Sequence, residues 1–146
     1  MVKCENHHLY KKWIGLKKER IKLGRIFILI GAIVMALSVA IGAFGAHGLE
    51  GRLSERMLKN YQTGVQYHMI HGVGLLFVGI LSLKMTANQM VNGAGWAFLI
   101  GIVLFSGSLY VMALTGITKL GAITPIGGLA FIVGWVLLGI AAMRYV

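Results

Sequence analysis

The sequence predicts an all-α integral membrane protein, a bundle of four transmembrane helices. Of its 146 residues, 58% are hydrophobic and 12% are charged, against roughly 45–50% and 25% in an ordinary soluble domain. Four runs without Asp, Glu, Lys or Arg come close to the ~20 residues that cross a bilayer core. They cover residues 26–46, 65–83, 94–114 and 120–143. Because backbone groups in lipid must hydrogen-bond within their own segment, runs of this length form helices.

The composition also excludes several kinds of chemistry. With only 4 acidic residues the chain offers few carboxylates for acid–base catalysis, and a single Cys excludes an intramolecular disulfide and a multi-thiolate metal site. Gly is abundant at 21 residues while Pro occurs once, which indicates close helix packing rather than a disordered tract. We therefore expect no catalytic residue, no metal site and no cofactor.

A basic tail precedes the first span. Residues 1–25 contain 8 of the 14 Lys and Arg residues, so we separate a tail, residues 1–23, from a four-span domain, residues 24–146. A helical stripe beside this charge would bind anionic headgroups, at ~1 kcal/mol per basic residue near the surface. Its apolar members are Leu9, Trp13, Leu16 and Leu23. Since the remainder is membrane-buried, we expect lipid and no nucleic acid as partner.

The tail has a second interpretation, in which translation begins at Leu23. The Lys-Lys-Glu-Arg run at residues 17–20 is what a purine-rich ribosome-binding stretch spells when read in frame. Leu23 follows a few codons later, where a TTG codon can initiate. In that case Cys4 and the His7–His8 pair are artefacts of the assigned start, a hypothesis that the nucleotide sequence decides.

The first loop has its own pattern, with apolar residues four apart and basic residues largely off that stripe. It predicts an amphipathic helix lying in the headgroup region, the alternative being a docking surface for a partner. The apolar residues are Leu49, Leu53, Met57 and Tyr61.

Small residues four apart mark helix interfaces in lipid. The first span carries such a stripe, which continues to His47 and predicts that this histidine faces the bundle. In the second span His68 and His71 share one face with Gly64, Leu75 and Gly79. The small-residue stripes are Ala32, Ala36, Ala40 and Ala43 in the first span, Gly93, Ala97 and Gly101 in the third, and Ala130 and Gly134 in the fourth.

The fourth span has a start signal. Thr124 is predicted to be the N-cap and Pro125 the first helical residue, with residues 121–124 non-helical at the membrane edge. In the third span, serine hydroxyls are expected to bond back to a carbonyl or across to another helix. Trp96 and Trp135 are expected to be interface anchors or packing residues.

Ionisable groups inside a membrane are default site candidates. Four interpretations of the histidines stay open: structural hydrogen bonding, a proton relay, a small-ligand site, and ligation of haem or metal. The polar positions expected to form one satisfied interhelical cluster, or else a ligand or proton site, are His47, Tyr67, His71, Ser106, Ser108, Tyr110 and Thr124.

Four ordered motifs resemble a family of small bacterial membrane proteins, the domain-of-unknown-function 423 group, also called uncharacterised protein family 0382 and related to transmembrane protein 256. They are GAFGAHG at 42–48, Gln62-Thr63 with Tyr67 and His71, LFSGSLY at 104–110, and TPIGG at 124–128 followed by Gly134-Trp135. The resemblance covers about residues 24–143. It implies a four-helix membrane protein with no established activity. Members commonly begin just before the first span, which favours the Leu23 start, and often have glutamine where His68 stands.

We therefore predict a non-enzymatic multi-pass protein of the cell membrane that serves assembly or interaction, as a homo-oligomer or with other membrane proteins. One alternative is a transporter or channel component in which His47 and His71 line a path for protons or a small solute; another is a haem- or quinone-linked redox component. Ten Lys and Arg lie on the side of the termini against four on the other, which predicts cytoplasmic termini. Without residues 1–22 the counts are three against four and decide nothing.

Overall fold

The computed structural model describes residues 2–85 and 89–144, without the side chains of residues 2–9, 13, 17 and 20. The described part is helical and contains no strand, which confirms the all-α prediction. The predictions about Cys4, the His7–His8 pair, Leu9 and Trp13 lie outside the described side chains.

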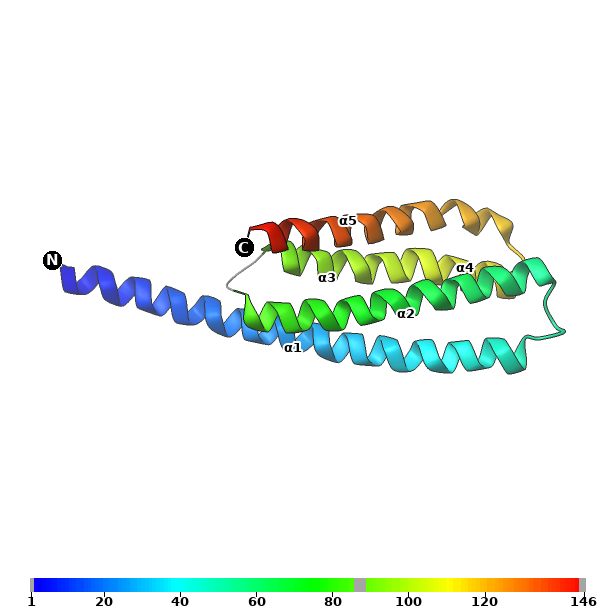
Figure 1. The fold of residues 1–146 in the computed structure, drawn as a ribbon, viewed down its shortest axis with the longest axis horizontal. Helices are drawn as coiled ribbons and strands as arrows, with labels where there is room; N and C mark the ends of the chain where they lie inside the picture. The colour runs from blue at the N-terminus through cyan, green and yellow to red at the C-terminus, as the bar shows by residue number, and fades with distance from the viewer. Residues whose placement is uncertain (1, 86–88, 145–146) are drawn as a thin grey trace.

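Four helical segments are long and apolar enough to cross a membrane. The first is α1 (Val2–Gly48) and the second is α2 (Glu55–Lys84). The third is continuous through α3 (Gln89–Gly101), a π-helical turn η1 (Ile102–Ser106) and α4 (Gly107–Thr115). A 3₁₀ turn, η2 (Thr118–Ala122), leads into the fourth, α5 (Thr124–Met143). Both termini lie at one end of the bundle (Figure 1).

Local sequence explains where these helices begin and end. Gly51 and Gly116 take positive φ angles of 72° and 74°, which glycine adopts without the steric cost of a Cβ. Gly116 thereby ends α4, its N–H bonding to the carbonyl of Met112. Ser54 caps α2 by accepting a hydrogen bond from the N–H of Met57.

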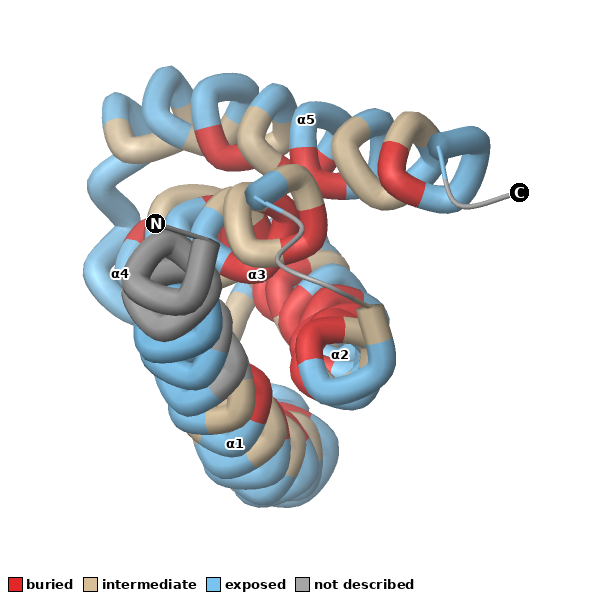
Figure 2. Tube along the Cα trace, turned by 90° about the vertical axis from the view of Figure 1, so that its left-hand side faces the viewer, coloured by how far each residue is buried: buried red, intermediate tan, exposed pale blue. Residues whose placement is uncertain are grey.

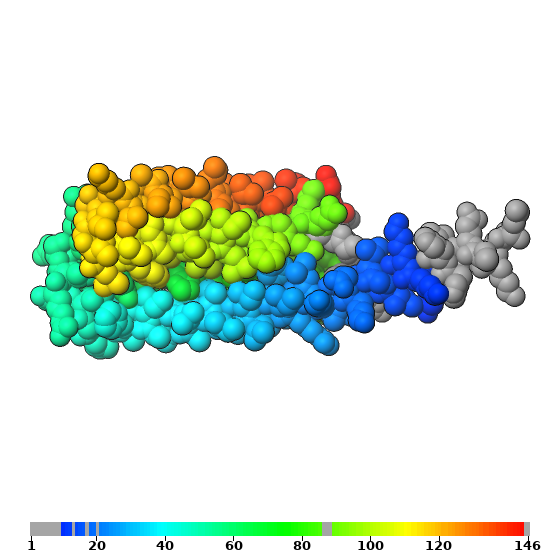
Figure 3. Space-filling model, turned by 180° about the vertical axis from the view of Figure 1, so that it is seen from behind, coloured from blue at the N-terminus to red at the C-terminus, as the bar shows by residue number. Residues whose placement is uncertain are grey.

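The helices pack in the order α1, α2, third span, α5. As a result the first and fourth spans are outer helices. In their most apolar stretches 17% and 22% of the residues are buried, against 44% and 50% in the second and third spans. Figure 2 shows this difference as buried residues gathered on α2 and α3. The N-terminal part of α1 projects beyond the other helices (Figure 3). A 47-residue helix is about 70 Å long at ~1.5 Å per residue.

Glycines allow the close approach of neighbouring helices. A Cβ on Gly79 of α2 would lie 2.8 Å from the backbone nitrogen of Ile28 and 2.9 Å from the carbonyl oxygen of Gly24, both in α1. Between the third and fourth spans, Gly101 contacts the ring of Phe131 and Gly134 that of Phe98. The small-residue interface predicted for these two spans is confirmed.

The prediction that the small-residue stripe of the first span faces the bundle is wrong. Ala32, Ala36, Ala40 and Ala43 are all exposed on the outer side of α1. The packed face instead carries Gly24, Phe27, Gly31, Ser38 and Gly45, all buried. This face packs inside because its three glycines allow the backbone of α1 to approach α2 closely.

The first loop forms no separate interfacial helix, contrary to prediction. Residues 55–61 are the first turns of α2. The apolar stripe exists but packs inward: Leu49 and Tyr61 are buried against Ala113 of α4, and the Tyr61 hydroxyl donates to the Ile41 carbonyl at 2.9 Å. The stripe is covered by protein rather than by lipid.

Thr124 is also not the N-cap that the sequence predicts. The cap position is Ile123, which makes no side-chain hydrogen bond, while Pro125 stands in the first turn as expected. The Thr124 hydroxyl turns instead to Ser108 of α4, at 2.9 Å. The Thr124 hydroxyl therefore bonds to a neighbouring helix instead of to the backbone N–H groups at the start of its own helix.

Candidate functional site

His71 is the most fully engaged polar side chain between the spans. It is 3% exposed. Its Nδ1 lies 2.7 Å from the carbonyl oxygen of Tyr67, one turn earlier in α2, and the indole N–H of Trp135 in α5 donates to its Nε2 at 3.1 Å. A carbonyl only accepts and an indole N–H only donates. The imidazole is therefore assigned as neutral, with its proton on Nδ1.

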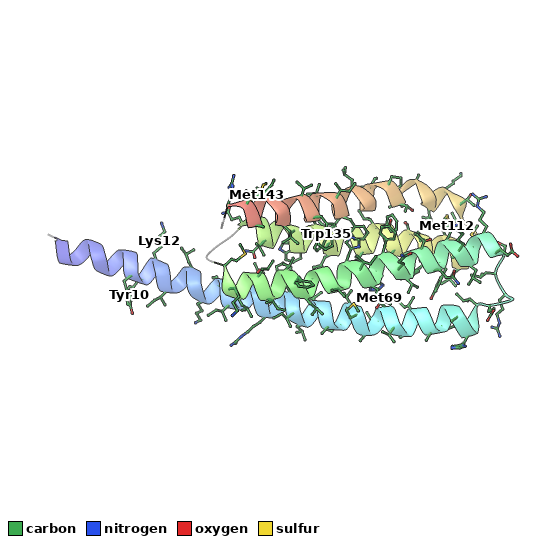
Figure 4. The ribbon with its side chains drawn as sticks, in the orientation of Figure 1. Tyr10, Lys12, Met69, Met112, Trp135 and Met143 are labelled. Carbon is green, nitrogen blue, oxygen red and sulfur yellow. The ribbon has the colours of Figure 1, made fainter. Side chains whose placement is uncertain are left out.

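Aromatic rings hold this imidazole in place. The ring of Phe131 stacks on it, with centroids 3.4 Å apart and planes 8° from parallel. Phe98 and Trp135 complete the surroundings at centroid distances of 5.4 and 6.0 Å, and Figure 4 shows Trp135 on α5. Trp135 is thus a packing residue with a specific partner rather than an interface anchor. In this arrangement neither nitrogen of His71 has a free lone pair for a metal or haem.

His68, one turn before His71, is bonded differently. Its Nδ1 shares a hydrogen bond of 3.1 Å with the hydroxyl of Tyr110 in α4. Its Nε2 is buried and has no hydrogen-bond partner among the described residues. The carbonyl of Val34 in α1 lies near the ring, but not in hydrogen-bond geometry. His68 therefore keeps one buried polar atom unsatisfied.

The two serines of the third span also differ. Ser108 donates to the carbonyl of Phe105 at 2.9 Å and pairs with Thr124 at 2.9 Å, so it bonds both back along its helix and across to α5. Ser106 is fully buried, and its hydroxyl has no partner in the described part of the chain. It ends the π-helical turn η1, a feature found frequently at functional sites.

The two unsatisfied atoms belong to one level of the bundle. Gly64 of α2 contacts Tyr110 of α4, and Gly74 of α2 contacts Phe98 of α3, so α2 and the third span run antiparallel. Between these two contacts, Ser106 lies at the same height in the bundle as His68. The α1–α2 contacts lead to the same result for Ser38. Val34 of α1 contacts Gly72 of α2 and Gly42 contacts Val65, so Ser38, between Val34 and Gly42, also lies at the height of His68. Ser38 is fully buried and donates to the carbonyl of Met35 at 2.8 Å. Three spans thus contribute buried polar groups to one layer.

The predicted single, satisfied cluster does not form. His71 with Trp135, His68 with Tyr110, and Ser108 with Thr124 are separate pairs, and Ser106 is unsatisfied. Tyr67 takes part through its backbone carbonyl and through its ring, 4.5 Å from that of Phe105.

His47 is exposed near the end of α1. The small-residue stripe that was expected to aim it at the bundle faces outward instead. No group of three or more His, Cys, Asp or Glu side chains that could hold a metal ion occurs within residues 2–85 and 89–144, as far as their side chains are described.

Ser38 was not predicted, because the alanine stripe indicated another face of the first span. Trp135 was predicted as an anchor or packing residue, without its hydrogen bond to His71. Ser82 donates to the Asn92 side-chain oxygen at 3.2 Å, joining α2 to α3. The sequence indicates this pair only by a polar residue at the end of the second predicted span and another just before the third.

The serines provide a matched test of this description. Ser106→Ala is expected to leave stability unchanged or to raise it by about 1 kcal/mol, because it removes a buried hydroxyl without a protein partner. Ser108→Ala is expected to lower stability by about 1 kcal/mol, because it removes the bond to Thr124. Unfolding in mixed micelles, followed by circular dichroism, measures both. A larger loss for Ser106→Ala than for Ser108→Ala would contradict the assignment.

Comparison with known proteins gives consistent results. A family model described as a protein of unknown function (DUF423) matches residues 41–128. The UPF0382 membrane protein YwdK of Bacillus subtilis is 51% identical over 121 residues, which cover 83% of this chain and 98% of the relative. The UPF0382 membrane protein of Staphylococcus haemolyticus is 51% identical over 122 residues, covering 84% and 98%. One from Staphylococcus epidermidis is 50% identical over 121 residues, covering 83% and 98%. No solved structure matches the chain.

Proposed function

The chain belongs to the DUF423 family, whose UPF0382 relatives are named membrane proteins, and from this premise we propose a non-enzymatic protein of the cell membrane that serves assembly or interaction. The main support for this proposal is the hydrogen bonding of His71. His71, one of the ligand candidates in the sequence, uses both ring nitrogens for structural hydrogen bonds. One bonds to the Tyr67 carbonyl in the preceding turn of α2 and the other to Trp135 of α5. A histidine bonded in this way stabilises a helix contact and is not available to a substrate.

The interior beside this histidine supports the same proposal. Between His71 and the Ser82–Asn92 pair, toward the end with the termini, the core includes apolar side chains without exposure: Phe27, Leu75, Val78 and Phe98. A proton or solute path needs polar groups or water along its length. The predicted path through His47 and His71 is further weakened because His47 is exposed and remote from the packed face of α1.

The outer face of α1 offers a surface for interaction. Ala32, Ala36 and Ala40 recur every fourth residue and are exposed. Stripes of this kind let two helices approach closely in lipid, where packing rather than the hydrophobic effect drives association. A second copy or another membrane protein would fit this face.

Two measurements test the function. The full chain reconstituted in vesicles is expected to give the proton and solute flux of protein-free vesicles, and flux that falls in a His71→Gln variant would overturn the proposal. A photo-cross-linking residue at Ala36 in host membranes is expected to give one discrete adduct. The matched control is the same residue at Ala142, which is exposed on α5. Equal cross-linking at both positions would argue against a specific interface.

We also propose that both termini are cytoplasmic, as the distribution of Lys and Arg favours. Cysteine labelling tests this in a Cys4→Ala background. Glu50→Cys suits the test better than Ser54→Cys, because Ser54 caps α2, and both positions are exposed in the same loop. An impermeant thiol reagent is expected to label Glu50→Cys in intact cells and to leave Lys84→Cys, at the opposite end, unlabelled. The reverse pattern would refute the orientation.

A further inference from the structure

A groove opens on the outside of the bundle between α2 and α5. It exists because α2 and α5 pack mainly on opposite sides of the third span (Figure 2). Its volume is about 710 Å³, and its walls include Ile70 of α2 with Leu129, Ile132 and Trp135 of α5. These four side chains are 46%, 61%, 61% and 45% exposed. The lower part of the groove is therefore an apolar slot that faces the surrounding lipid.

The upper part of the groove is polar. Gln66 and Tyr67 line it together with Pro125, in the first turn of α5, and both are exposed. Neither the Gln66 amide nor the Tyr67 hydroxyl has a hydrogen-bond partner among the described residues. Polar groups that face hydrocarbon are costly unless bonded. Both groups can donate to a carbonyl oxygen.

A cation stands above these polar groups. Lys59 lies seven residues before Gln66 and eleven before Ile70, which puts all three on one face of α2. Lys59 is exposed and forms no ion pair within the described part of the chain. It stands about 16 Å from Ile70 along the helix at ~1.5 Å per residue. Lys59 is not part of the groove wall, but it lies on the same face of α2. A positive charge, hydrogen-bond donors and an apolar slot therefore follow one another along that helix face.

We propose that this groove binds one anionic phospholipid. The phosphate pairs with Lys59, an ester carbonyl accepts from Gln66 and Tyr67, and an acyl chain lies between Ile70 and Trp135. A phospholipid in the bilayer carries its phosphate, ester and hydrocarbon in this same order from the surface inward. It can therefore bind in the groove in the orientation that it already has in the membrane.

Charge favours a lipid over a second copy of the chain. This end of the bundle carries four basic residues, Arg52, Arg56, Lys59 and Lys119, and two acidic ones, Glu50 and Glu55. Two copies meeting at this groove in parallel would bring net positive ends together, whereas an anionic headgroup neutralises them.

Two glycines of α5 give a matched pair of variants. A Cβ on Gly128 would make only ordinary contact with the Phe105 ring, at 3.7 Å, and Gly128 lines the groove. Gly128→Leu therefore fills the slot without moving the backbone. Gly139 meets nothing within 4 Å and is exposed, so Gly139→Leu adds the same side chain away from the groove.

Native mass spectrometry of the full chain in mild detergent, titrated with phosphatidylglycerol and with phosphatidylcholine, tests the proposal. One phosphatidylglycerol is expected to be retained by the unchanged protein and by Gly139→Leu, and to bind at least tenfold more weakly to Gly128→Leu. Lys59→Gln is expected to abolish the preference for phosphatidylglycerol while binding of phosphatidylcholine remains.

Three results would overturn it. Equal retention by all variants would mean surface lipid without a site. A dimer that only Gly128→Leu dissociates would assign the groove to a second copy. A bound molecule that is not a phospholipid and is lost only from Gly128→Leu would assign it to another ligand. Circular dichroism of each variant confirms that it is folded.

Discussion

Replacing Gly127 by alanine is expected to separate α5 from the third span and to cost about 3 kcal/mol or more of stability. A Cβ at this position would collide with the backbone nitrogen of Phe105 and lie 2.8 Å from its Cα. Overpacking typically costs 1–3 kcal/mol where side chains can move, but here the obstacle is backbone. The helix must shift, and the bonds from Ser108 to Thr124 and from Trp135 to His71 would be strained or lost.

Gly107 supplies the control, because it lies in the third span with open space around a Cβ. Gly107→Ala is expected to be neutral or stabilising by up to about 1 kcal/mol, the difference in helix propensity. Denaturation in mixed micelles, followed by circular dichroism and tryptophan fluorescence, compares the two. Similar stability for both variants would show that the close approach at Phe105 is not required.

His71→Ala is expected to cost about 3 kcal/mol. It removes a buried ring packed on Phe131, leaves a cavity, and leaves the indole N–H of Trp135 without its acceptor. The matched control is His47→Ala, expected to change stability by less than about 0.5 kcal/mol because His47 is exposed.

A double-mutant cycle isolates the hydrogen bond itself. Trp135→Phe combined with His71→Ala is expected to give a coupling energy of about 1 kcal/mol, within the range measured for interhelical hydrogen bonds in membranes. A stable His71→Ala protein that has lost a measurable flux or a visible chromophore would instead assign His71 to a functional site.

Several features of the fold could be predicted from the sequence because they depend on composition and periodicity. Four uncharged runs gave four helices, since lipid leaves the backbone no other way to satisfy its hydrogen bonds. The face of α2 that carries Gly64, His68, His71, Leu75 and Gly79 is buried as predicted, because a helix with five such positions on one side has one face suited to close packing.

Most residues of the candidate site could be identified from the sequence, although Ser38 was missed and His47 was wrongly included. Their hydrogen-bond partners could not be predicted. Tyr110 and Ser108 were identified, yet their partners His68 and Thr124 lie 42 and 16 residues away, a separation that no local pattern encodes. Thr124 illustrates the reason: its hydroxyl had a good local use as a cap, and a bond across to α4 displaced it.

The membrane environment, the number of spans and the family motifs could be predicted because each depends on consecutive residues. Which face of α1 lies inside depends on packing against the other helices. Alanines and glycines both permit close packing, and the choice fell to Gly24, Gly31 and Gly45, whose partners on α2 complement them. That choice left His47 on the surface, and the packing of the third span between α2 and α5 opened a groove that no single helix contains.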